Sequence, residues 1–185
     1  MRSQLKKLSN YLASFELAFA GFLVALMTIL IVINVVTRAL NHALFWVDEA
    51  AIFVMVWAVF LGSIVLMKRR QMVAVTLIKD WLPPSLKQLY GVIYDLSILV
   101  FAILLLVFSW IWYQPYDLWL HNFDVMEFSA SSMNFIYQEI SNTLRWPKYV
   151  VWWIIPYMGL SCLFHSAVNL LNDPTGKYVL EEETK

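Results

Sequence analysis

Charged residues are scarce in this 185-residue chain. Asp, Glu, Lys and Arg make up 14% of it, against about 25% in ordinary soluble domains. The formal net charge is zero, so the chain offers no basic face of useful size and we expect no nucleic-acid partner. Hydrophobic residues make up 61% of the sequence, which is the composition of a membrane protein.

Cysteine, glycine and histidine are also few. The single cysteine, Cys162, allows no disulfide within the chain and no Cys-x-x-Cys pair, which excludes quinone-linked thiol oxidation. Five glycines form no phosphate-binding loop, and neither an HExxH motif nor a hydrolase nucleophile elbow is present. Haem binding would need paired histidines within apolar runs, and only His165 lies in one. We therefore expect no enzyme, no cofactor and no metal site.

Four long segments contain no Asp, Glu, Lys or Arg at all. They cover residues 17–37, 50–67, 96–116 and 149–172, and a membrane-spanning helix needs about 20 mainly apolar residues. The sequence predicts an all-α integral membrane protein with four transmembrane helices, over about residues 13–39, 46–67, 88–113 and 148–171. We expect one membrane domain, residues 1–172, and a short cytoplasmic tail, residues 173–185.

The positive charges favour one orientation in the membrane. Lys and Arg cluster before the first span and between the second and third, whereas the outer connections hold few of them, namely Arg38, Arg145 and Lys148. The positive-inside rule places both termini in the cytoplasm. Short amphipathic helices at the membrane interface are expected in residues 71–82 and in the aromatic-rich outer connection, residues 114–148. Residues 1–16 could form another, or could extend the first span into the cytoplasm.

Opposite charges face each other across the turn between the first two spans. Asn34 and Arg38 are four residues apart and share one helix face, while Asp48 and Glu49 lie in the first turn of the second span. An unpaired charge next to lipid is costly. An ion pair between Arg38 and either Asp48 or Glu49 is therefore expected to hold the two helices together.

Three other groups of polar residues lie near the inner side. The basic run Lys68, Arg69 and Arg70 is interpreted as a topology signal and a contact with lipid headgroups. Asp95 is expected to pair with a Lys or Arg of the preceding loop, although an intramembrane carboxylate could also bind a proton or a cation. Glu16 lies at the inner edge of the first span. Pro156 predicts a kink in the fourth span, because it frees the carbonyl of Trp152.

The order of these residues resembles the small membrane subunit of tripartite ATP-independent periplasmic (TRAP) transporters. The resemblance rests on a series of short motifs along nearly the whole chain: Asn34 and Arg38, Trp46 and Glu49, Trp57 and Gly62, the basic run 68–70, the stretch 143–147, and Pro156 before Gly159. One departure is Met72, which stands where the family often has a histidine. No role for that histidine carries over.

The resemblance implies a static scaffold in the bacterial inner membrane. Its partners would be membrane lipid, a large sodium-coupled permease subunit, and a periplasmic binding protein that delivers an organic acid of the C4-dicarboxylate or sialic acid class. Arg38 and Glu49 would be retained positions of the small subunit, which we interpret as an ion pair; Asn34, Trp46, Asp48 and Trp57 are further structural or subunit-contact candidates. Two alternatives are a small multidrug-type exporter that uses Glu16, and a membrane anchor of another complex.

Overall fold

The computed structural model describes residues 2–72 and 81–172, and almost all of them are helical. The helices are α1 (Arg2–Ala39), α2 (Phe45–Arg69), α4 (Pro84–Tyr113), α5 (Pro115–Leu120), α6 (Val125–Ser132), α7 (Lys148–Trp152) and α8 (Ile154–Asn172). Four helical stretches are long and apolar enough to cross a membrane: Arg2–Ala39, Phe45–Arg69, Leu89–Leu120 and Lys148–Asn172. The predicted all-α fold with four spanning helices is confirmed.

The first helix is longer than a membrane span requires. α1 runs without interruption for 38 residues, about 57 Å at 1.5 Å per residue, whereas the hydrocarbon core is about 30 Å thick. Residues 2–16 therefore continue the first span as one helix and do not form a separate interfacial helix. Their buried side chains recur at spacings of three and four along one face, which continues into the span: Ser9, Ala13, Glu16, Ala20 and Leu23.

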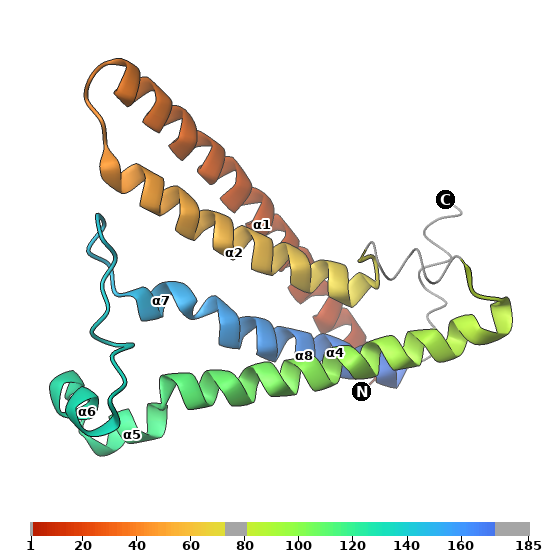
Figure 1. Cartoon of the computed structure of the whole chain (residues 1–185). Helices are drawn as coiled ribbons and strands as arrows, with labels where there is room; N and C mark the ends of the chain where they lie inside the picture. Colours follow the sequence, from red (N-terminus) through yellow and green to blue (C-terminus); the bar gives the residue numbers. More distant parts are fainter. Residues whose placement is uncertain (1, 73–80, 173–185) are drawn as a thin grey trace.

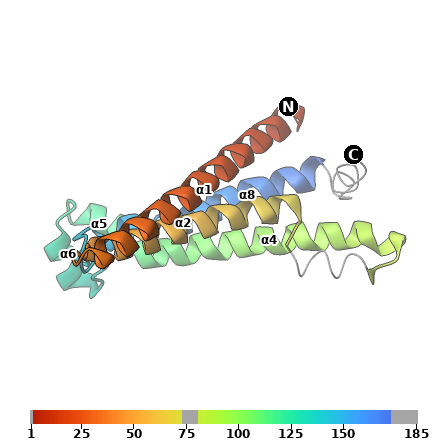
Figure 2. The same ribbon diagram turned by 90° about the horizontal axis from the view of Figure 1, so that it is seen from above.

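Helix α8 lies at the centre of the molecule. α1 and α2 form an antiparallel hairpin, α8 packs against both of its helices, and α4 packs along another side of α8 (Figures 1 and 2). The shared core contains small or aliphatic residues from all four elements, namely Ala20, Leu23, Ala58, Leu61, Ile64, Ala102, Ile154, Met158 and Cys162. The α4 and α8 backbones approach closely at Gly159, where an added Cβ would lie 3.5 Å from the Ala102 carbonyl oxygen.

The fourth span is interrupted near its outer end. α7 stops at Trp152, Trp153 forms a turn, and α8 starts at Ile154 (Figure 1). Pro156 has no N–H to offer the carbonyl of Trp152, so the interruption lies where the sequence predicts a kink. The indole N–H of Trp57 on α2 donates to the carbonyl oxygen of Val151 at 2.8 Å. This bond supplies a donor for a carbonyl beside the break and links α2 to α7.

The outer connection between the third and fourth spans is folded. α5 and α6 fill its first half, and Asp124 caps α6 by accepting from the N–H groups of Met126 and Glu127. The Tyr137 hydroxyl donates to the Tyr113 carbonyl at 2.6 Å, and its ring packs against Phe128. Burial raises the pKa of Tyr137, with a further contribution from Tyr149.

Part of the expected interfacial structure lies outside the described residues. Two short helices, α5 and α6, are present in the outer connection, and their position at the membrane interface stays a prediction. The second amphipathic segment, residues 71–82, falls mostly within residues 73–80, and the predicted cytoplasmic tail is residues 173–185; neither of these stretches is described.

Candidate functional site

The turn between α1 and α2 is closed by three polar side chains. Arg38 forms an ion pair with Asp48 through Nη2 and Oδ2, and the Asn34 amide donates to the other oxygen of Asp48. The guanidinium Nε of Arg38 also donates to Asn34 Oδ1 at 3.0 Å. Each member of this triangle contacts the other two. The predicted ion pair of Arg38 is therefore present, with Asp48 as its partner.

Glu49 does not pair with Arg38, so that interpretation is wrong. Its carboxylate accepts hydrogen bonds from the backbone N–H groups of Asn142 (2.8 Å), Thr143 (2.7 Å) and Leu144 (2.9 Å). The Thr143 hydroxyl adds a fourth bond at 2.6 Å. Successive residues of a helix point about 100° apart, so Asp48 and Glu49 face different neighbours. Glu49 fastens the start of α2 to the end of the outer connection.

The two tryptophans singled out from the sequence lie at different depths. Trp46 is exposed in the first turn of α2, next to the turn between α1 and α2. Trp57 lies three turns further along α2 and is the residue that bonds to Val151 on α7. Of the two, Trp57 is the one that the structure places between spanning helices.

A second ion pair lies at the other end of α2, after its last turn. Arg70 follows α2 in the left-handed conformation (φ 55°) and pairs with Asp95 on α4; their side chains are 8% and 1% exposed. The expected pairing of Asp95 with a cation from the preceding loop is confirmed. Arg70 points inward, so the headgroup contact predicted for it does not apply.

The other two residues of the basic run differ from each other. Lys68 Nζ donates to the Ser9 carbonyl at 2.7 Å and to Asn10 Oδ1 at 2.9 Å, which ties the end of α2 to α1. Lys68 thus has partners within the protein. Arg69 is exposed, and its headgroup role stays a prediction.

Glu16 is the centre of a buried polar network between α1 and α8. It is 0% exposed and accepts from the hydroxyls of Tyr157 (2.9 Å) and Ser161 (2.5 Å). His165 Nε2 lies 3.2 Å from its other oxygen, and His165 Nδ1 lies 2.7 Å from the Ser9 hydroxyl. The Nε2–H group of His165 donates to the carboxylate, and Nδ1 shares a hydrogen bond with the Ser9 hydroxyl. Every ring nitrogen and carboxylate oxygen of the network therefore has a partner.

The partners of Glu16 on α8 were not predicted from the sequence. Tyr157, Ser161 and His165 recur every four residues, so they form one polar stripe on an otherwise apolar helix. This spacing is the signal that could have revealed a buried polar contact. His165 is hydrogen-bonded through both ring nitrogens.

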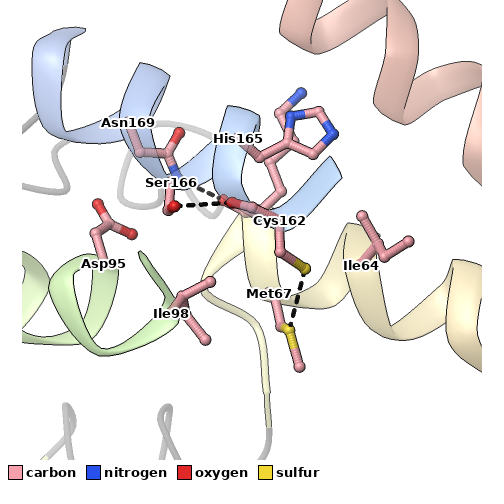
Figure 3. Close-up of a pocket in the computed structure, with 9 residues that line it drawn as sticks. Ile64, Met67, Asp95, Ile98, Cys162, His165, Ser166 and Asn169 are labelled. Carbon is pink, nitrogen blue, oxygen red and sulfur yellow. Dashed lines mark hydrogen bonds between the residues drawn. The ribbon is translucent and has the colours of Figure 1, made fainter. Parts of the chain in front are cut away.

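Ser9, His165 and Glu16 are connected in the order of a hydrolase triad, but the surroundings exclude that chemistry. The three side chains are 0–1% exposed, so no substrate carbonyl can reach the Ser9 hydroxyl. Next to His165, residues of α2, α4 and α8 converge around Cys162 (Figure 3). These side chains pack so closely that the space between them is too small for a water molecule. Within the described ranges, 2–72 and 81–172, no group of three or more His, Cys, Asp or Glu could hold a metal ion.

The sequence that forms these four spans matches a known protein family. Residues 27–175 match the family described as tripartite ATP-independent periplasmic transporters, DctQ component. The chain belongs to the DctQ family. DctQ proteins are components of transporters, so this chain is not an enzyme. Together with the four apolar helices, the family assigns it to the bacterial inner membrane as a multi-pass protein.

Two curated relatives support the assignment. A C4-dicarboxylate TRAP transporter small permease protein of Vibrio cholerae serotype O1 is 29% identical over 116 residues, which cover 62% of this chain and 50% of the relative. A protein of Haemophilus influenzae described as a TRAP transporter small permease protein is 33% identical over 93 residues, covering 50% of this chain and 58% of the relative. The chain thus spans about half the length of the relatives it matches. No solved structure matches.

Proposed function

We propose that this DctQ-family chain is the static small permease subunit of a TRAP transporter. It holds a large, sodium-coupled permease subunit in the inner membrane, while a periplasmic binding protein delivers an organic acid. The Vibrio relative is described as a C4-dicarboxylate transporter protein, which supports the organic-acid class; sialic acid is the second substrate class considered. The chain itself would carry no cofactor, and sodium would bind to the large subunit.

This proposal rests on the partners of the carboxylates in and near the spans. Asp48 and Asp95 form ion pairs with arginines, Glu49 binds backbone amides, and Glu16 lies within the network of α1 and α8. A carrier would instead need polar groups that a substrate can reach near mid-membrane. These carboxylates connect helices of one chain, which is what a rigid support requires.

The apolar surface of the spans is largely uncovered within the chain. In the most apolar 18-residue stretch of each span, the buried share is 11%, 22% and 17% for the first three spans and 44% for the fourth. Lipid or the helices of another membrane protein can cover the remaining surface. These faces therefore leave room for a larger membrane subunit to dock.

The proposed orientation places both termini in the cytoplasm. The basic ends of α1 and α2 then lie on the inner side, as the positive-inside rule requires. The triangle of Asn34, Arg38 and Asp48 then lies at the periplasmic end, together with Glu49, α5 and α6. The outer connection would be the part of the chain nearest to the binding protein.

Co-purification and reconstitution test the proposal. After expression in its own host, the tagged chain should retain a much larger multi-spanning protein in mild detergent. In proteoliposomes, uptake of a C4-dicarboxylate or sialic acid driven by a sodium gradient should require this chain, the large subunit and the binding protein together. Sodium-driven uptake by the chain alone would refute the scaffold role.

A small exporter of lipophilic cations is the second candidate, because an intramembrane carboxylate is often functional and Glu16 is one. In that case Glu16→Gln would abolish export by a purified homodimer in proteoliposomes. The scaffold proposal expects no export from the wild-type chain and a loss of stability in the variant. The two proposals therefore give opposite results with the unmodified protein.

A further inference from the structure

A groove of about 480 Å³ opens at the outer end of the molecule, between α4, α7 and the outer connection. Its lining includes Phe108, Ile111 and Trp112 of α4, together with Trp152 of α7 and Phe135 of the outer connection. The rings of Trp112 and Trp152 are 6.4 Å apart. Its volume lies within the range of about 300–1,000 Å³ that is typical of small-molecule sites.

Two opposite charges stand at this groove. Lys148 Nζ lies 3.4 Å from Glu139 Oε2, and their side chains remain 37% and 57% exposed. The backbone fixes their positions, because the Lys148 N–H donates to the Glu139 carbonyl at 2.9 Å and Ile140 forms a β-bridge with Pro147. The two charged groups are thus held side by side, and both remain accessible to a ligand.

An apolar track leads from the groove along α4. Phe101, Leu104, Phe108 and Ile111 are exposed and follow one another at spacings of three, four and three residues, so they share one helix face. In the membrane this face runs from the aromatic level of Trp112 into the hydrocarbon region. A hydrocarbon chain that lies along it would stay in contact with apolar side chains.

We propose that this groove binds one phospholipid of the outer leaflet with a zwitterionic, primary-amine headgroup, that is, a phosphatidylethanolamine. Its phosphate contacts the Lys148 ammonium, its own ammonium donates hydrogen bonds to the Glu139 carboxylate, and one acyl chain follows the track on α4. Charge complementarity decides in favour of this occupant, because the groove presents one cation and one anion a few ångströms apart, above an apolar wall. The inference does not depend on the proposed transport role.

Lipid titration of the full-length, delipidated chain in detergent tests this site. Native mass spectrometry would count the adducts formed with phosphatidylethanolamine and, in parallel, with phosphatidylglycerol, which has the phosphate but no ammonium. The wild-type chain should bind one phosphatidylethanolamine more tightly than phosphatidylglycerol. Glu139→Gln should remove this preference. Lys148→Gln should lower the affinity for both lipids by about tenfold, as expected for the loss of one charge-assisted contact.

Two further variants distinguish lipid binding in the groove from nonspecific lipid binding around the spans. Ile111→Trp fills the groove without changing any charge and should abolish the tight adduct. Arg145→Gln removes an exposed cation from the same connection, outside the groove lining, and should bind lipid as the wild type does. Circular dichroism verifies that each variant is folded. The proposal would be overturned if the two lipids bound equally well, or if the groove variants bound lipid as the wild type does. A protein segment that occupies the groove in the purified complex would also overturn it.

Discussion

Carboxylates near the ends of the spans are held by two kinds of donor. Glu16 is bound by the side chains of Tyr157, Ser161 and His165, whereas Glu49 binds mainly backbone N–H groups of residues 142–144. Side-chain donors can be removed one at a time by substitution. Backbone donors remain whatever the side chains are, so the three backbone bonds to Glu49 can be tested only from the carboxylate side.

Removal of Glu16 should destabilise the protein strongly. Glu16→Ala leaves the Tyr157, Ser161 and His165 donors without their buried acceptor and should lower the free energy of unfolding by about 3 kcal/mol or more. Thermal unfolding in detergent measures the effect, with Glu127→Ala, at an exposed carboxylate, as the matched control. Glu16→Leu combined with His165→Leu should cost less than the sum of the two single changes, since the pair is removed together. Additive costs would contradict a coupled network.

Glu49→Gln should loosen the outer connection without separating α1 from α2. The amide keeps one acceptor oxygen and replaces the other with an NH2 donor, so in either orientation at least one backbone N–H of residues 142–144 faces a donor instead of an acceptor. Limited proteolysis should then cut the connection between residues 133 and 147 faster than in the wild type. Asp48→Asn, at the adjacent carboxylate, should leave this cleavage rate unchanged. Equal acceleration in both variants would show that the connection depends on the turn between α1 and α2 instead.

At the scale of the element, the close packing of α8 on α4 depends on Gly159. A Cβ at this position would lie 2.9 Å from both Cγ and Cδ2 of Leu106, so Gly159→Ala forces that side chain to move. Overpacking of this kind costs about 1–3 kcal/mol. Gly62→Ala is the matched control, because a Cβ there meets nothing within 4 Å, and alanine should stabilise that helix by up to about 1 kcal/mol.

A second substitution checks the physical reason. If Leu106 is the obstacle, Leu106→Ala combined with Gly159→Ala should cost less than the two single changes added together. Differential scanning fluorimetry of the four variants in one detergent gives the comparison. The same loss for Gly159→Ala and Gly62→Ala would show that the contact does not limit the packing.

The spanning helices could be predicted from the length of the apolar segments, whereas the pairing of the polar side chains could not. The four spans and the break near Pro156 depend on local composition, which the sequence displays directly. Whether Asp48 or Glu49 meets Arg38 depends on the rotation of α2 about its axis, and a difference of about 100° between neighbours decides it. Arg70 could not be assigned to Asp95 because its inward direction follows from a left-handed backbone conformation after α2.

At the scale of the whole molecule, the proposed orientation makes the two ends chemically distinguishable. Ser3→Cys should resist a membrane-impermeant thiol reagent in intact cells, whereas Glu127→Cys in α6 should react, after permeabilisation of the outer membrane. Both positions are exposed, and Cys162, the single native cysteine, is 1% exposed and should contribute little background. Labelling of Ser3→Cys at the rate of Glu127→Cys would reverse the assigned topology.

The central position of α8 makes the molecule unequally tolerant to mutation. α8 has extensive contacts with each of the other spans, whereas α4 packs extensively against α8 alone. Variation on the lipid-facing sides of α1, α2 and α4 can accumulate with little loss, because each of these helices turns much of its surface away from the rest of the chain. A change on α8 disturbs several interfaces at once. During evolution, the sequence of the last helix should therefore drift the slowest.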